Sequence, residues 1–177
     1  TDKFFELIKD GFRYIKNDKI ILHLIFLLLS VGLTSFDALI TILAKNEYKY
    51  VISVPLAIGI SNAVRAVALM FGPIFISKYV TKQNLHYLLI FQGIAIILWG
   101  LMQDNFYVSL IALFIVGLST TTLWSFTYAL LQDKCDEKYI GRVISYNDMF
   151  FMLSCIVTTL FIGLMASLTS IDIITIL

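Results

Sequence analysis

Arg65 lies near the middle of a stretch of about thirty mostly apolar residues, 51–80. A helix of this length can cross a hydrocarbon core of roughly 30 Å with some tilt. A charged side chain at that depth costs roughly 2.5–3.5 kcal/mol on insertion scales, and it persists where it faces water or a carboxylate inside a bundle. We therefore expect the rest of the chain to form helices that give Arg65 such surroundings.

The composition of the whole chain indicates a membrane protein. Of its 177 residues, 59% are hydrophobic and 14% are charged, and the mean hydropathy is +0.90. Soluble domains average about 45–50% apolar residues and about 25% charged residues. We expect an all-α, polytopic transmembrane helix bundle at residues 20–177, after a cytoplasmic amphipathic linker at residues 1–19. Five full spans and the start of a sixth are expected at about residues 20–44, 51–77, 85–103, 106–132, 143–168 and 171–177.

The positions of Lys and Arg predict the orientation of this bundle. Ten of the thirteen lie in the linker and in the loops after the second and fourth spans, whereas the loops after the first and third spans hold only Lys45 and Lys49. Because cytoplasmic loops carry an excess of Lys and Arg, we expect the N-terminus of the chain in the cytoplasm. The abundance of Ile, Lys, Phe and Asn fits an AT-rich bacterial genome, so we expect an integral protein of the bacterial inner (plasma) membrane, in contact with membrane lipid.

Several functional classes find no support in the sequence. The net charge of +1 gives no basic bias toward nucleic acid. Cys135 and Cys155 do not have the spacing of a metal site, a redox motif or a disulfide framework. The chain also lacks a phosphate-binding glycine loop and a paired nucleophile and base. We therefore expect no enzyme activity, no cofactor, no metal and no nucleic-acid partner.

Three ionisable residues fall within the expected spans, and they are the first candidates for chemistry. At 1.5 Å per helical residue, Asp37, Arg65 and Asp148 lie about 25, 18 and 9 Å from the cytoplasmic side. Arg65 can therefore reach one of the two acids at a time, and the sequence leaves open which one. In one interpretation the charges exchange partners during transport, an acid takes up a coupling proton, or Arg65 binds an anionic substrate. In the other, a fixed ion pair neutralises itself and holds two helices together.

Further candidates are polar residues that lie near these charges or share one helix face. Asn62 precedes Arg65 by one turn. In the fourth span, Thr121, Ser125 and Tyr128 follow one another at i, i+4 and i+7, so they share a face that could line a substrate cavity. The alternative is that small polar residues let neighbouring helices pack closely and form hydrogen bonds to one another.

Two segments resemble the C-terminal half of the twelve-span transporters of the major facilitator superfamily. In the loop after the fourth span, Gln132 is followed by Gly141-Arg142-Val143, which is similar to a segment of siderophore and macrolide exporters, although Asp136 stands where proline is usual. Residues 11–15 (Gly-Phe-Arg-Tyr-Ile) resemble the segment ahead of the seventh span. The resemblance implies a cytoplasmic gating loop, an interpretation weighed against an ordinary solvated loop, with these members: Gln132, Asp136, Glu137, Gly141 and Arg142.

The resemblance also implies a function. The chain would be half of a secondary active transporter that moves a small-molecule substrate by alternating access, with proton-coupled efflux as the expected mode. It begins with Thr1 and ends inside an apolar run, so we expect a fragment whose partner is the missing N-terminal half of the same protein. The alternatives are a uniporter or nutrient importer of the same fold, and a membrane scaffold or receptor that transports nothing.

Overall fold

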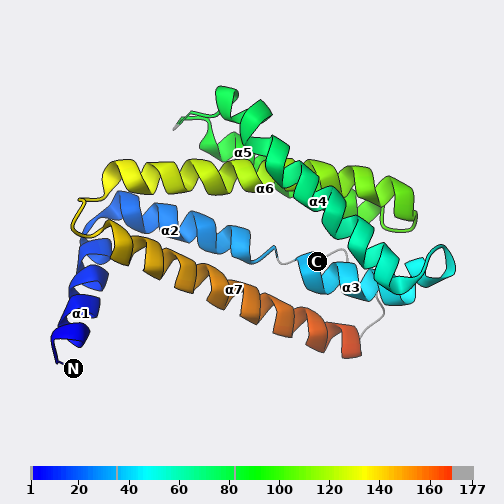
Figure 1. Ribbon diagram of the computed structural model, residues 1–177, viewed down its shortest axis with the longest axis horizontal. Helices are drawn as coiled ribbons and strands as arrows, with labels where there is room; N and C mark the ends of the chain where they lie inside the picture. The colour runs from blue at the N-terminus through cyan, green and yellow to red at the C-terminus, as the bar shows by residue number, and fades with distance from the viewer. Residues whose placement is uncertain (1, 35, 82, 169–177) are drawn as a thin grey trace. The chain divides into compact units, whose positions relative to one another are not determined.

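The structure, a computed structural model, describes residues 2–34, 36–81 and 83–168, and every element in these ranges is helical, which confirms the all-α class. Figure 1 shows the helices in chain order. Their bounds are α1 Asp2–Asn17, α2 Lys19–Gly32, α3 Phe36–Asn46, η1 Tyr48–Tyr50, α4 Val54–Ile76, η2 Ser77–Tyr79, α5 Leu85–Leu101, α6 Phe106–Lys134 and α7 Ile140–Leu168.

Four segments within the described residues are long and apolar enough to cross a membrane, by length and composition. They are Lys19–Asn46, Val54–Ile76, Phe106–Lys134 and Ile140–Leu168. The expected third span corresponds to α5, an apolar helix of 17 residues, which at 1.5 Å per residue is somewhat shorter than a typical hydrocarbon core. The count of five full spans therefore stays a prediction, and the expected sixth span at 171–177 lies outside the described residues.

The first candidate span, expected over residues 20–44, contains two helices, α2 and α3. Asp18 caps the start of α2, because its Oδ1 accepts hydrogen bonds from the backbone N–H groups of Ile20 (2.8 Å) and Ile21 (3.2 Å). At the other end α2 stops at Gly32, and α3 begins at Phe36. The interruption places Asp37 in the first turn of α3, where the partial positive charge of a helix N-terminus favours an acidic residue.

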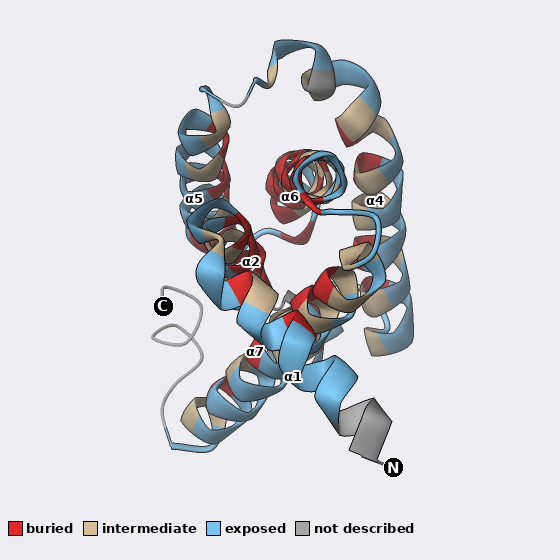
Figure 2. Ribbon diagram, turned by 90° about the vertical axis from the view of Figure 1, so that its left-hand side faces the viewer, coloured by how far each residue is buried: buried red, intermediate tan, exposed pale blue. Residues whose placement is uncertain are grey.

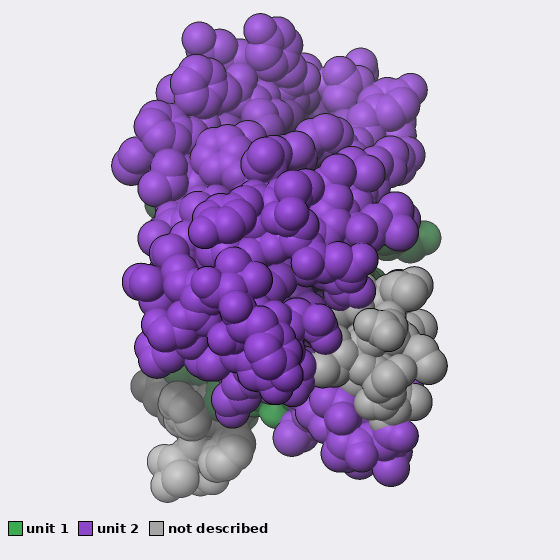
Figure 3. All heavy atoms as spheres, turned by 90° about the vertical axis from the view of Figure 1, so that its right-hand side faces the viewer, with its two compact units in different colours: residues 1–34, 124–158 green, residues 35–123, 159–177 purple. Residues whose placement is uncertain are grey.

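The chain divides into two compact units, which Figure 3 shows in different colours. Unit 1 comprises Thr1–Thr34 and Trp124–Thr158, and unit 2 comprises Ser35–Leu123 and Thr159–Leu177. Helices α6 and α7 each contribute residues to both units. Buried residues are frequent along α6 (Figure 2), because small and branched side chains such as Ala112, Val116 and Ser119 are almost fully enclosed.

The core of unit 2 joins α3, η1, α4, α5 and α6. Tyr48 is enclosed there: its ring contacts Phe106 edge-on at a centroid distance of 5.0 Å, and its hydroxyl donates a hydrogen bond to Ser109 (3.1 Å). Burial raises the pKa of the Tyr48 phenol above its ordinary value of 10.0. The remaining buried members of this cluster are Ile40, Leu43, Ala44, Ala57, Ala95, Trp99, Ala112, Leu113 and Val116.

Helices α4 and α6 approach closely in unit 2 because small residues lie at their contact. A Cβ added at Gly72 would lie 2.5 Å from the carbonyl oxygen of Leu118, and one added at Gly117 would lie 2.6 Å from Cβ of Ala68. Ala68 and Gly72 are four residues apart and therefore share one face of α4. Small residues spaced in this way let two membrane helices pack backbone against backbone.

In unit 1, α1 packs against the loop between α6 and α7 and against the start of α7. The rings of Tyr14 and Tyr139 stack with their centroids 4.3 Å apart. The Tyr146 hydroxyl donates a hydrogen bond to the carbonyl oxygen of Ile8 (2.8 Å). Gly11 lies beneath Tyr146, and a Cβ added there would be 3.2 Å from that ring and from Cβ of Arg142. The segment expected as a linker is thus a helix anchored by aromatic contacts.

Candidate functional site

Arg65 and Asp37 form an ion pair between two candidate spans within unit 2. Nη2 of Arg65 lies 2.9 Å from Oδ1 of Asp37. Of the two acids that the sequence offered, the partner in the structure is therefore Asp37. The side chain of Asp37 is 70% exposed and that of Arg65 is 25% exposed, so the carboxylate stays open to a proton or a solute while it holds the guanidinium.

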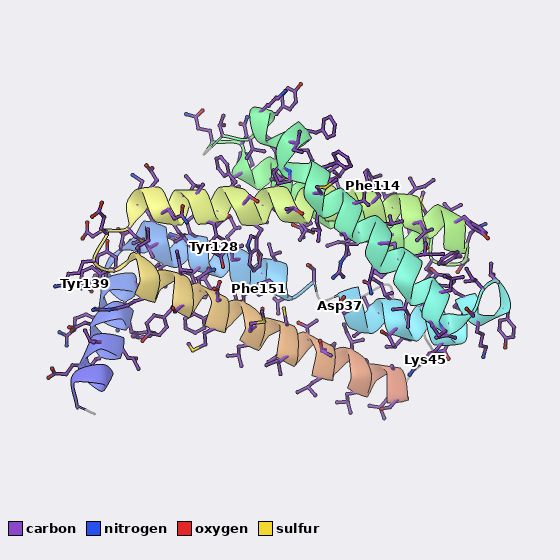
Figure 4. The ribbon with its side chains drawn as sticks, viewed as in Figure 1. Asp37, Lys45, Phe114, Tyr128, Tyr139 and Phe151 are labelled. Carbon is purple, nitrogen blue, oxygen red and sulfur yellow. The ribbon has the colours of Figure 1, made fainter. Side chains whose placement is uncertain are left out.

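Backbone features of three helices position this pair. Asp37 projects from the beginning of α3, where Figure 4 labels it. Arg65 lies in the middle of α4, and Gly117 of α6 lies beside it: a Cβ added at Gly117 would be 3.2 Å from the Arg65 carbonyl oxygen and 3.7 Å from its Cγ. The absence of a side chain at Gly117 thus leaves room for the stem of Arg65. Asn62, expected near the pair, is exposed and precedes Arg65 by one helical turn.

Asp148 belongs to a second polar cluster, which lies in unit 1 between α6 and α7. The hydroxyl of Tyr128 donates a hydrogen bond to Oδ1 of Asp148, and Nδ2 of Asn147 approaches the same oxygen at 3.4 Å. Asn147 is only 1% exposed. Its Oδ1 has no hydrogen-bond partner in the described part of the chain, so a buried acceptor remains beside the carboxylate.

The rings of Trp124 and Phe151 cover this second cluster, and sequence reasoning did not assign these two residues to the site. Trp124 stacks on Tyr128 with centroids 5.2 Å apart, and its ring meets Phe151 of α7 edge-on at 4.4 Å. Figure 4 labels Tyr128 on α6 and Phe151 on α7. The i, i+4 spacing of Trp124 and Tyr128 is a signal that could have predicted their stacking. In contrast, the sequence carries no signal for the contact with Phe151.

The three residues of the expected polar face in the fourth span differ in their contacts. The Thr121 hydroxyl donates a hydrogen bond to the carbonyl oxygen of Gly117, one turn earlier in α6 (3.1 Å). Ser125 is exposed, and Tyr128 bonds to α7 through Asp148. A further polar contact involves Gln92 of α5, which is 4% exposed and donates to Thr120 (3.2 Å). Part of this polar run therefore connects helices, as the helix-packing interpretation expects.

Of the expected gating loop, Asp136 and Glu137 lie in the connection between α6 and α7, whereas Gln132 lies in the last turn of α6 and Gly141 and Arg142 in the first turn of α7. The connection contacts α1. The backbone N–H of Asp136 donates a hydrogen bond to the Tyr14 hydroxyl (3.1 Å). Lys138 and Arg142 place their cationic groups 5.4 and 5.5 Å from the centre of the Tyr139 ring, within the range of cation–π attraction. The other expected members of the loop are all exposed: Gln132, Glu137 and Gly141.

Cys135 begins this loop and is buried. Burial raises the pKa of its thiol from 9.0 to about 11, which lowers the reactive thiolate fraction at neutral pH about a hundredfold. We expect N-ethylmaleimide to label Cys135 about a hundredfold more slowly than a cysteine introduced at exposed Glu137, each measured as the single cysteine of the protein. Comparable labelling rates would contradict the burial of the thiol.

The same pKa fixes the sign of a pH effect on stability. Because folding raises the pKa of the Cys135 thiol, the fold favours the protonated form. This contribution is complete below pH 9.0 and is lost as the pH rises through about 11. The labelling rate is therefore expected to keep rising up to about pH 11, whereas the rate at the exposed position levels off near pH 9.

Within the described ranges, no group of three or more His, Cys, Asp and Glu side chains could hold a metal ion. Asp37 instead pairs with the guanidinium of Arg65, and Asp148 bonds to the phenol of Tyr128 and the side-chain amide of Asn147. Several long apolar helices, with an ion pair between two of them, define the class of polytopic helical membrane proteins.

Comparison with known families gives this class a name. Residues 2–159 match the profile of the Major Facilitator Superfamily, and the chain belongs to this superfamily. It is therefore an integral membrane protein of the major facilitator type of transporter. No curated protein and no solved structure matches the chain.

Proposed function

We propose that the chain is the C-terminal half of a secondary active transporter that exports a small molecule across the bacterial inner membrane, in exchange for protons. The observation that carries this proposal is the ion pair between Asp37 and Arg65, in which the carboxylate remains 70% exposed. An accessible acid that holds an intramembrane cation can couple protonation to a change in helix contacts. The other half of the protein would complete the substrate cavity.

The proposed coupling step follows from the charges. When Asp37 is ionised, it neutralises Arg65 and holds α3 against α4. A proton on Asp37 removes the negative charge, and the guanidinium, which stays protonated in proteins, then needs another anion or water. An anionic group of the substrate, or Asp148, would serve as that second partner at another stage of the cycle. Proton uptake and helix rearrangement are then linked through one residue.

Three sets of residues have supporting roles in this proposal. Asn62 of α4 is one candidate substrate contact. On α6 the exposed Ser125 is another, and Thr121 and Tyr128 share its helix face. Asp148, held by Tyr128, is the second acid. The loop that contains Asp136, together with Arg142 at the start of α7, would act as a cytoplasmic latch, since the loop already contacts α1. The similarity of this loop to that of siderophore and macrolide exporters supports export as the direction of transport. The distribution of Lys and Arg supports a cytoplasmic N-terminus.

A flux experiment on the full-length protein tests the coupling. The protein is reconstituted in liposomes, and uptake of labelled erythromycin and of enterobactin is measured with and without a pH gradient. We expect gradient-driven uptake of at least one probe. In Asp37→Asn this uptake is lost, whereas exchange of labelled for unlabelled probe without a gradient is retained. The matched control is Asp104→Asn, which alters an exposed carboxylate outside the site and should leave both activities unchanged.

Each of the other outcomes would contradict the proposal in its own way. Exchange of probe in the wild-type protein that is indifferent to the pH gradient would indicate a uniporter. Uptake driven in the direction of proton flow would indicate an importer. Absence of flux for every probe, in a protein that is folded by its thermal unfolding curve, would favour a scaffold or receptor.

A further inference from the structure

Helices α1, α2 and the first part of α7 meet at one end of unit 1 (Figure 1). Side chains from these three helices line an apolar groove. Its volume is about 320 Å³, which lies within the range of small-molecule sites. Among its lining residues, Lys16 is the only charged one. The others are Phe12, Ile15, Leu22, Ile25, Phe26, Leu29 and Phe150.

The groove is polar at one end and apolar along its length. Lys16 lies at the end of α1, and Lys19 and His23, both exposed, lie in the first turns of α2. Lys19, His23 and Phe26 are spaced at i, i+4 and i+7, so they share the face of α2 that borders the groove. From Leu22 to Leu29 the lining of α2 is entirely apolar, over a length of about 10 Å at 1.5 Å per residue.

This gradient of polarity fits a lipid better than a soluble partner. Two lining phenyl groups remain open to the surroundings, since Phe12 is 49% exposed and Phe26 is 57% exposed. Helix α2 belongs to a candidate span, so we expect its exposed apolar side chains to face acyl chains. The basic end of the groove coincides with the side that the distribution of Lys and Arg assigns to the cytoplasm, where anionic headgroups attract basic residues.

We propose that this groove binds the acyl chain of an anionic phospholipid from the cytoplasmic leaflet, with Lys16 holding its phosphate group. The acyl chain lies along Leu22, Phe26 and Leu29 of α2. Lys19 and His23 border the headgroup on the same side. A lipid seated there joins α1 to α2 and α7, and so strengthens the docking of α1 beside the loop that begins at Cys135.

Binding is tested by native mass spectrometry of the purified full-length protein in detergent, with dioleoyl phosphatidylglycerol and dioleoyl phosphatidylcholine as probes. We expect the anionic lipid to bind about fivefold more tightly, the effect of one basic residue at an anionic headgroup. Lys16→Gln is expected to abolish this preference, and Lys16→Arg to keep it. The control Lys49→Gln removes an exposed Lys at the opposite end of the candidate span and should keep the preference.

A second pair of variants tests the apolar part of the groove. Phe26→Ser is expected to weaken the binding of both lipids by a similar factor, because it removes an acyl contact and no charge. Phe75→Ser alters a phenyl group of similar exposure on α4, outside the groove, and should leave both affinities unchanged. Equal affinity of wild-type protein for the two lipids would overturn the proposal. Equal effects of Lys16→Gln and Lys49→Gln, or of Phe26→Ser and Phe75→Ser, would also overturn it.

Discussion

Replacing Arg65 with Gln is expected to lower gradient-driven transport by about one to two orders of magnitude. Gln cannot carry the charge whose pairing with Asp37 is proposed to link protonation to the contact between α3 and α4. Coupling free energies of this kind are about 1–3 kcal/mol, which corresponds to roughly 5–150-fold. Arg65→Lys should retain part of the activity, because it keeps the positive charge while it loses the planar donor geometry of the guanidinium. Initial rates of probe uptake into proteoliposomes provide the measurement.

Removing the acid of the ion pair is expected to lower the stability of the protein more than removing the base. Asp37→Asn leaves a permanent cation within a candidate span, which we expect to cost about 1–2 kcal/mol, a value reduced for the partial exposure of Arg65. Arg65→Gln leaves Asp37, which is 70% exposed and can bind water or a proton, so the cost should be smaller. The double variant should recover most of the loss. Thermal unfolding in detergent that shows Arg65→Gln as the more damaging change would contradict this account.

The second large effect is expected at the contact between α4 and α6. Gly72→Ala places a Cβ 2.5 Å from the carbonyl oxygen of Leu118, so the two helices must separate. Overpacking of this kind costs about 1–3 kcal/mol, which corresponds to a fall in Tm of roughly 2–12 °C for a chain of this size. Gly72→Leu should prevent the accumulation of folded protein. Fluorescence-detected size exclusion and thermal unfolding measure both effects.

Gly59→Ala is the matched control on the same helix. A Cβ at Gly59 meets nothing within 4 Å, and alanine is favoured over glycine in a helix by about 0.8–1.0 kcal/mol. We therefore expect unchanged or slightly increased stability. If Gly59→Ala lowered Tm as much as Gly72→Ala, the loss would reflect a general sensitivity of α4 rather than its contact with α6.

Much of the fold could be predicted from composition and from the length of the apolar runs. Hydropathy over about twenty residues reports burial in lipid directly, and it indicated the segments that form α4, α6 and α7. It did not reveal the interruption between Gly32 and Phe36, because a window of that width averages over a short break. The polar residues near Thr34 were visible, but they were interpreted as part of one span.

The sequence predicted which residues belong to the candidate site better than it predicted which of them contact one another. Arg65 and Asp37 were identified because charges inside spans are rare and costly. Their pairing depends on helix rotation and depth, which the sequence leaves open. The same holds for Asp148, whose partner Tyr128 is twenty residues away, and for Tyr14, which reaches Asp136 across 122 residues. Such contacts are set by packing between helices and not by local periodicity.

The position of Asp37 at the start of α3 has a geometric consequence for its ion pair. A helix behaves as a stiff rod, because each peptide group is tied to the next turn by a hydrogen bond. A small rotation of α3 about its own axis would therefore carry the Asp37 carboxylate as a unit toward or away from Arg65 of α4. Both helices belong to unit 2, so this motion needs no change in unit 1.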